Sequence, residues 1–365
     1  GLNTASVNYY FKRRDDLAVA CYHRALERIE EMAALAAAQA TPRERVRHYL
    51  ELNIELLRQV RAGEARPITV LSDIRAMDDP VRAGLSDRYR AIMRIVRGFF
   101  GPDGTAANKR LLVARTHILL ENVYWLPAWI GAYPSYDFPR VLARMMEVFD
   151  HGIMPANADW AQRPLPMQPQ GGDDISRAAQ RKFLQAATRL INERGYRGAS
   201  VERIASELNV TKGSFYHHLE AKDDLVLACF RRSFVTFTHA QRLADDAGAN
   251  HGQRLMISLA TLLDVQFSER GPLLRTTALQ ALPSEFRSGV IDSSDRMARR
   301  FAGTLADGIS DGSVRAIDPM IASQMLMPMI NSAYELHGWA EAMAPDEAIR
   351  LYASTMATGL FDPVG

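Results

Sequence analysis

The chain has little of several features that would assign it to a specialised class of protein. It has 365 residues but only 2 cysteines, which excludes a disulfide framework and suggests a reducing compartment. Its formal net charge is only +2, so it is not an indiscriminate polyanion-binding protein. The longest apolar stretch, residues 118–132, contains Glu121 and Asn122 and is too short to span a bilayer. No basic-then-apolar leader opens the chain. We therefore expect a soluble, cytoplasmic protein.

An internal repeat is the first feature that the sequence does have. Residues 6–17 (SVNYYFKRRDDL) match residues 214–225 (SFYHHLEAKDDL), and the match continues to Cys21 and Cys229. The last residues of the two blocks, Leu17 and Leu225, are 208 positions apart. A second match pairs Pro67 with Pro272, and a third pairs residues 124–129 with 334–339. Three blocks in the same order predict a tandem duplication.

Apolar residues recur at helical spacing and alternation is scarce, which predicts an all-α fold. Leu50, Ile54 and Leu57 are typical of this spacing. Residues 154–175 hold four prolines and a Gly-Gly pair, and so are expected to form a linker. Four further prolines, at positions 80, 283, 319 and 345, fit the first turn of a helix. Four glycines, at positions 101, 104, 308 and 312, fit turns between helices.

A helix-turn-helix is indicated between residues 176 and 230. We expect a first helix to stop at Gly195, Ser200 to cap a second, Thr211 to cap a third that runs to about His218, and Lys222 to open a fourth. Two short helices joined by a tight turn allow the second to enter the major groove of DNA. Residues 176–232 hold 11 Lys/Arg and 6 Asp/Glu, a local charge of +5 that favours phosphate contact, although a charged face can also be merely solvated.

The candidate DNA contacts lie around the start of the third helix and at matching positions of the first copy. Residues at the start of such a helix meet base edges, and nearby hydroxyl, imidazole and ammonium groups donate hydrogen bonds to phosphates. The candidates are Ser200, Thr211, Lys212, Gly213, Ser214, Tyr216, His217 and Lys222, with Asn3, Thr4, Ala5, Asn8, Tyr9 and Arg14 in the first copy.

The block from Val201 to Leu225 (VERIASELNVTKGSFYHHLEAKDDL) resembles the helix-turn-helix signature of the TetR family of transcriptional regulators, with Leu219 where phenylalanine is usual. The resemblance is strong over residues 176–230 and again over 1–22, and is only architectural elsewhere. It implies a DNA-binding head on a helical body that binds a small effector and dimerises through its last two helices. Binding of the effector in such proteins changes the spacing of the two heads.

The sequence departs from that family in two ways. Gly1 aligns with Asn209, so the first two helices of the first head would lie upstream of Gly1. The family pairs two identical chains, whereas this chain would carry both partners. Helices near residues 109–132, 138–152, 319–342 and 345–360 would then form an intramolecular four-helix bundle.

We therefore expect two tandem TetR-like units that form an intramolecular pseudo-dimer, each a helix-turn-helix head with a helical body for ligand binding and dimerisation. The expected parts are a partial helix-turn-helix (1–22), the first body (23–153), the Pro-rich linker (154–175), the second helix-turn-helix (176–222) and the second body (223–365).

The effector site is expected in the bodies, because small-molecule pockets are mostly apolar with a few placed polar groups. An aromatic or methionine stripe at helical spacing is also typical of core packing, which is the more frequent role of any single residue. The candidates suggest a hydrophobic or aromatic effector. They are Tyr49, Asn53, His117, Tyr124, Trp125, Trp129, Phe267, Met325, Met329, Tyr334 and His337.

No catalytic set, metal site or cofactor is predicted. The nine histidines show no metal-ligand spacing, and no acidic cluster accompanies them. Residues 308–312 (GISDG) match a hydrolase nucleophile elbow, but that device needs a preceding strand and here a helix precedes it.

The leading hypothesis is a ligand-responsive repressor that binds double-stranded DNA. It would read an asymmetric operator, because the recognition starts Asn3-Thr4-Ala5 and Thr211-Lys212-Gly213 differ. It would act as a monomeric pseudo-dimer or a higher homo-oligomer. The alternative is a ligand-binding or protein-interaction module with impaired DNA binding in its first copy. An enzyme has no support in the sequence.

Overall fold

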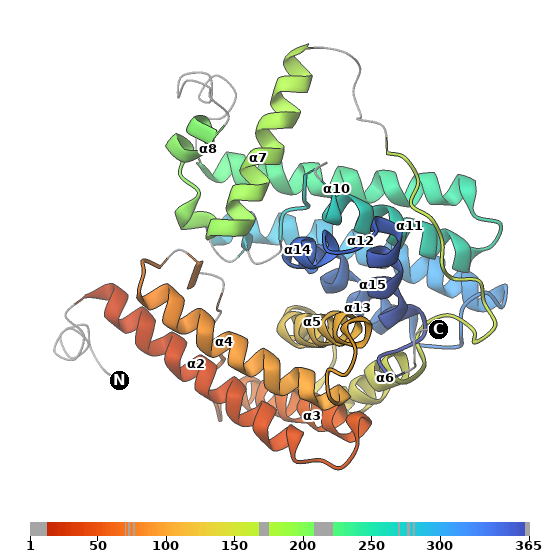
Figure 1. Cartoon of the computed structure of the whole chain (residues 1–365), viewed down its shortest axis with the longest axis horizontal. Coiled ribbons are helices and arrows are strands. Elements are labelled where there is room, and N and C mark those ends of the chain that lie inside the picture. Colours follow the sequence, from red (N-terminus) through yellow and green to blue (C-terminus); the bar gives the residue numbers. More distant parts are fainter. Residues whose placement is uncertain are drawn as a thin grey trace. The chain divides into compact units, whose positions relative to one another are not determined.

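The computed structural model describes residues 13–69, 71, 74, 75, 77–167, 175–207, 222–268, 271–275, 278, 279 and 282–361 (Figure 1). All regular secondary structure in these ranges is helical, which confirms the predicted all-α class. The chain divides after Pro102 into two compact units, residues 1–102 and 103–365. Within the described residues, no helix carries an apolar stretch that is long enough to cross a bilayer.

In the described residues, the first unit contains the long helices α2 (Arg14–Ala37), α3 (Pro42–Arg61) and α4 (Val81–Arg97), followed by the short helix η2 (Gly98–Phe100). Thr41 begins α3 with a capping box, in which its side chain accepts from the Glu44 backbone and the Glu44 side chain accepts from Thr41. Helix α2 packs against both α3 and α4. Apolar residues at helical spacing, such as Val46 and Leu50, are fully buried in this core.

The second unit contains the remaining helices. They are α5 (Ala106–Trp129), η3 (Ile130–Ala132), η4 (Ser135–Asp137), α6 (Phe138–His151), α7 (Ile175–Gly198), α8 (Val201–Glu207), α10 (Lys222–Ala247), α11 (His251–Phe267), α12 (Ser284–Ser310), α13 (Pro319–Ser332), η6 (Ala333–Leu336), α14 (His337–Ala340) and α15 (Pro345–Ala357). Residues 154–167 of the predicted linker form no helix, whereas its last residue, Ile175, already begins α7. Helix α10 packs against α7, α11 and α12.

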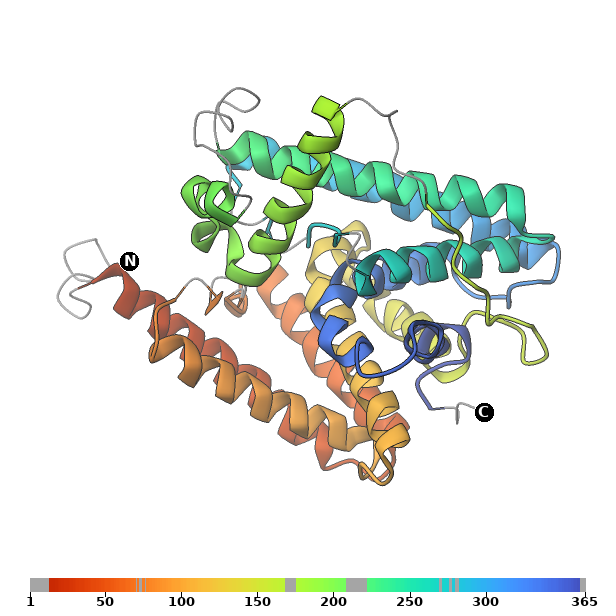
Figure 2. The same ribbon diagram turned by 45° about the horizontal axis from the view of Figure 1, so that its top comes forward.

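Helices α5 and α6 each pack against α13 and α15, which lie about 200 residues later in the chain (Figures 1 and 2). These are the helices that the sequence pairs in its bundle. The ends of α6 and α15 are joined by backbone hydrogen bonds, from Ile153 N to Met356 O at 2.9 Å and from Leu360 N to Phe149 O at 2.7 Å. Gly152 lies so close to this junction that a Cβ atom there would be 2.2 Å from the Ala357 carbonyl oxygen.

The structure corrects three details of the predicted helices. The helix expected over 319–342 is broken into α13, η6 and α14, because the Gln266 side-chain amide donates to the Ile330 and Asn331 carbonyls at the end of α13 (2.6 and 3.2 Å). Gly308 lies inside the last turn of α12 rather than in a turn, where its missing Cβ leaves room for Val314. Pro80 and Pro283 are N-cap residues, whereas Pro319 and Pro345 occupy first-turn positions as predicted.

Candidate DNA-binding head and buried polar cluster

Helices α7 and α8 form the described part of the predicted helix-turn-helix. The helical path of α7 is interrupted at Gly195 (φ 69°, ψ 169°), the residue at which the sequence predicts a stop. The Ser200 hydroxyl oxygen then accepts a hydrogen bond from the Arg203 backbone N–H at 3.2 Å, which is an N-cap of α8. An ion pair of 2.8 Å between Arg189 and Glu207 joins the two helices. The local sequence signals thus fix both helices of this segment.

A compact apolar core fixes these helices to α10. Ile204 of α8 is completely buried together with Ala187 of α7 and with Leu225 and Cys229 of α10. Burial raises the pKa of the Cys229 thiol to about 11. The buried thiol therefore has the role of a small apolar side chain in the core.

Lys222, a predicted phosphate contact, is the first residue of α10. Its ammonium nitrogen lies 4.2 Å from the centroid of the Tyr196 ring, and the Tyr196 hydroxyl donates a hydrogen bond to Asp223. Partial burial lowers the pKa of Lys222, and the neighbouring charge of Asp223 opposes that shift. The aromatic ring thus positions the ammonium group at the junction of α7 and α10.

Most of the predicted DNA contacts lie outside the described residues. Ser200 and Lys222 are described, and Arg14 is described only as the first residue of α2. Those outside are Asn3, Thr4, Ala5, Asn8, Tyr9, Thr211, Lys212, Gly213, Ser214, Tyr216 and His217. These residues stay predictions.

A non-helical segment, residues 271–275, is held by polar side chains from three helices. Asn192 of α7 donates to the Leu273 carbonyl at 2.9 Å and accepts from the Arg275 N–H at 3.1 Å. Ser233 of α10 accepts from the Leu274 N–H at 2.8 Å, and Gln266 of α11 accepts from the Leu273 N–H at 3.0 Å. Every one of these side chains is buried, so the backbone of the segment is fixed to the head helix α7 and to the body together.

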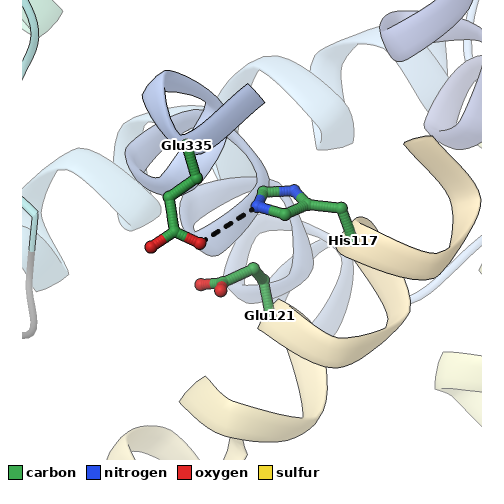
Figure 3. A group of neighbouring side chains, drawn as sticks. All are labelled: His117, Glu121 and Glu335. Atoms are coloured by element: carbon green, nitrogen blue, oxygen red, sulfur yellow. Dashed lines mark ion pairs between the residues drawn. The ribbon is translucent and has the colours of Figure 1, made fainter. Parts of the chain in front are cut away.

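The Arg275 side chain enters a largely buried polar cluster with His117, Glu121 and Glu335. Its guanidinium group is paired with the Glu335 carboxylate and lies 3.7 Å from Glu121 Oε1. Figure 3 shows both carboxylates on the side of the His117 ring that carries Nε2, and Nε2 lies 3.6 Å from Glu335 Oε2. Helix α5 supplies His117 and Glu121, and η6 supplies Glu335.

A hydrogen bond on the other side of the ring determines the tautomer of His117, and burial determines its charge. Its Nδ1 lies 3.0 Å from the Tyr352 hydroxyl, which itself donates to the Met329 carbonyl at 3.0 Å. The Tyr352 oxygen therefore accepts from Nδ1–H, and Nε2 carries a lone pair. Burial lowers the pKa of His117 to about 4, with Arg275 also lowering it and Glu121 opposing, so the ring is neutral at pH 7.

Several predicted effector residues lie in or beside this cluster. The Phe267 ring packs against Tyr352 with centroids 5.7 Å apart, and Met329 accepts the Tyr352 hydrogen bond. The Tyr334 hydroxyl donates to Glu193 of α7 at 3.1 Å, and its ring stacks on His337 at 4.7 Å. The structure thus brings together His117, Phe267, Met329, Tyr334 and His337 around η6.

The other predicted effector residues are core or half-buried side chains. Tyr49 and Asn53 are buried in the first unit, where Asn53 donates to the Tyr49 carbonyl. Trp129 packs edge-on against Tyr133. Met325 is completely buried in α13. Tyr124 and Trp125 are half-buried on α5. A pocket of about 260 Å³ lies between the linker, α11 and α15, and Trp160, Met256 and Ile349 are among its lining residues. None of the predicted effector residues lines this pocket.

Comparisons with known proteins assign the family. Residues 183–229 match the family model of bacterial regulatory proteins of the tetR family, and residues 248–360 match that of the tetracyclin repressor-like C-terminal domain. The chain belongs to the TetR family. It is a helix-turn-helix transcriptional regulator, as the resemblance predicts, and the matched relatives are regulators rather than enzymes.

Two curated relatives and one solved structure each match about half of this chain. The transcriptional regulator AcuR of Cereibacter sphaeroides is 26% identical over 176 residues, which is 42% of this chain and 73% of AcuR. The transcriptional repressor KstR2 of Rhodococcus jostii is 25% identical over 202 residues, which is 54% of this chain and 99% of KstR2. The crystal structure of AibR in complex with isovaleryl coenzyme A and operator DNA covers 49% of this chain and 97% of AibR, at 22% identity and a TM-score of only 0.40.

Proposed function

We propose that this TetR-family protein is a ligand-responsive repressor that binds an operator with two different half-sites as a single-chain pseudo-dimer. The observation that carries the proposal is the packing of α5 and α6 against α13 and α15 within one chain. The resemblance implies that, in this family, the last two helices of each body form the dimer interface. Here the helices before the linker have the helices at the end of the chain as their partners.

The order of helices supports the same proposal. Helix α10 begins at residue 222 and α2 at residue 14, a difference of 208, and α15 begins at 345 and α6 at 138, a difference of 207. These differences agree with the offset between the matching sequence blocks. KstR2, matched over 99% of its own length, occupies only 54% of this chain. A chain with two family units, one before and one after the linker, accounts for both observations.

The contacts of α7 support a response to a ligand in the body. Asn192 fixes α7 to the segment that carries Arg275, and Glu193 accepts a hydrogen bond from Tyr334, the neighbour of Glu335. A ligand that moved η6 or the 271–275 segment would therefore move the first head helix as well. The apolar side chains beside the cluster, such as Phe267 and Met329, favour a hydrophobic or aromatic effector.

An unbiased selection of DNA sites with the full chain tests the proposal. We expect enrichment of a site with two unlike half-sites, bound by one chain per duplex, and an affinity that falls steeply with salt because phosphates are neutralised. Reporter expression from that site should fall when the protein is present. A perfect palindrome bound by two chains would contradict the single-chain pseudo-dimer.

The alternative function is a ligand-binding or protein-interaction module with impaired DNA binding in its first copy. Footprinting of the selected site separates the two functions. Protection of two half-sites supports the pseudo-dimer, whereas protection of a single half-site supports impaired binding by the first copy. Absence of any retardation at low salt would contradict the repressor function.

A further inference from the structure

The Nε2 atom of His117 is a buried hydrogen-bond acceptor that the described residues leave unused. The residue is 3% exposed, and Nε2 has no hydrogen-bond partner. Because Nδ1 is committed to Tyr352, the ring presents a lone pair toward the Glu121 and Glu335 carboxylates (Figure 3). The lone pair of Nε2 and the carboxylate oxygens that face it are all electron-rich, so they repel one another unless a proton or a cation lies between them.

The charges of the cluster also leave room for a cation. Glu121 and Glu335 bring two carboxylates to the cluster, and Arg275 supplies one guanidinium group. The carboxylates therefore outnumber the cationic groups of these three side chains in a largely buried place. Arg275 pairs with Oε1 of Glu335 and leaves Oε2 facing His117. A bound cation would neutralise that excess without displacing Arg275.

The donor atoms have the spacing of metal ligands. One atom each from His117, Glu121 and Glu335 lies within 4.8 Å of the other two. Nε2 and Glu335 Oε2 are 3.6 Å apart, close to the edge of about 3.4 Å expected for two ligands each about 2.1 Å from a tetrahedral zinc ion. His117 and Glu121 are four residues apart on α5 and so share one helix face.

We propose that His117, Glu121 and Glu335 bind a divalent transition-metal ion, with Zn²⁺ as the best match to one imidazole and two carboxylates. Tyr352 fixes the tautomer that directs the lone pair of Nε2 toward the ion, and Arg275 holds the second ligand carboxylate in place. Three protein ligands leave one position of a tetrahedral ion open. The ion would also link α5 to η6, two elements far apart in the sequence.

Metal titration of the tag-free, chelator-treated full chain tests this proposal. We expect Co²⁺ to give visible absorption bands that saturate at one ion per chain, and Zn²⁺ to displace it. His117→Ala should weaken Zn²⁺ binding in calorimetry by at least about 100-fold, more than loss of a residue that only orients a ligand. The matched control is His251→Ala, since His251 is also paired with acidic residues, Asp307 and Asp311, but lies at the surface. This control should bind Zn²⁺ like the wild type.

A second measurement covers the case in which His117→Ala does not fold. Glu335→Gln keeps the shape of the side chain and removes one charged ligand, and it should lose the Co²⁺ bands while its circular dichroism stays native. Zn²⁺ should raise the thermal midpoint of the wild type but not that of this variant, because a ligand that binds only the folded state stabilises it. No saturable binding by the wild type, or equal binding by Glu335→Gln and His251→Ala, would overturn the proposal.

Discussion

The Asn192 side chain fixes the backbone of Arg275, with its Oδ1 3.1 Å from the Arg275 nitrogen. Asn192 belongs to α7, the first helix of the DNA-binding head, whereas the Arg275 side chain is paired with Glu335 in the body. One buried amide thus connects the head helix to the polar cluster through a single short segment of backbone. Substitutions at the two ends of this connection have separable consequences.

Asn192→Ala should lower the free energy of unfolding by about 1–3 kcal/mol, because it leaves the buried Leu273 carbonyl and Arg275 N–H without their partner. Urea denaturation followed by circular dichroism measures this. Asn157→Ala is the matched control, since Asn157 is exposed in the linker, and should change the free energy by less than about 0.5 kcal/mol. Equal midpoints for the two variants would show that the Asn192 hydrogen bonds contribute nothing to stability.

Lys222→Ala should weaken binding to all DNA sequences alike and reduce the slope of log affinity against log salt by about 1, because it removes one phosphate contact. Fluorescence anisotropy with the selected site and with unrelated duplex measures both effects. Lys109→Ala, an exposed lysine on α5, is the control and should leave both affinities unchanged. If Lys222→Ala behaves like this control, Lys222 does not contact phosphate.

Lys212→Ala should relax specificity instead, because lysine at the start of a recognition helix donates to guanine. Competition between the selected site and single-base variants of it measures the change. Affinity for unrelated duplex should fall by a smaller factor than affinity for the selected site. An unchanged ratio between the two would place the recognition helix elsewhere in the sequence.

Gly152→Ala should destabilise the junction of α6 and α15 by about 2 kcal/mol or more, because the new Cβ would overlap the Ala357 carbonyl and the residue has φ 67°. Thermal unfolding measures the loss. Gly131→Ala is the control, since no atom lies within 4 Å of its added Cβ and its φ is not positive, and should shift the midpoint little. A midpoint for Gly152→Ala as high as that of the control would contradict the close approach of the two segments.

Cys229 should make stability fall as the pH rises from about 8.5 to about 11. Its native pKa is about 11, above the value of about 8.5 for an exposed thiol, so the unfolded chain loses its proton first. The stability that is present below pH 8.5 is then lost progressively, by about 3 kcal/mol at most. Urea midpoints across this range should decline more steeply for the wild type than for Cys229→Ala. Cys21→Ala, which removes the half-buried cysteine, should keep the wild-type decline.

Sequence patterns predicted the parts of the fold that depend on local chemistry. The stop at Gly195, the cap at Ser200 and the start of α10 at Lys222 all depend on residues within one helical turn of the event. The pairing of the early and late bundle helices could be predicted because the repeat and the family resemblance supplied a long-range constraint. The break after α13 could not, since it is caused by Gln266, which lies more than 60 residues away.

The polar cluster was missed for a similar reason. Spacing along the sequence identifies only residues that are neighbours on one helix. Arg275 and Glu335 lie on different elements from His117, so spacing could not place them beside it. One signal was present, because His117, at the edge of an apolar run, and Glu121, inside it, are four residues apart and so share one helix face. The run was interpreted as too short for a membrane and as a source of aromatic effector contacts, so Glu121 counted as an interruption rather than as a member of a site.

The packing of α5 and α6 on α13 and α15 has a consequence for behaviour at low copy number. Two halves of a contact that belong to one chain meet at an effective concentration set by the linker, not by the amount of protein. Dilution therefore does not separate them, and a single molecule per cell would keep the contact intact. The two sides are also free to accumulate different substitutions, because a change in one is not copied into the other.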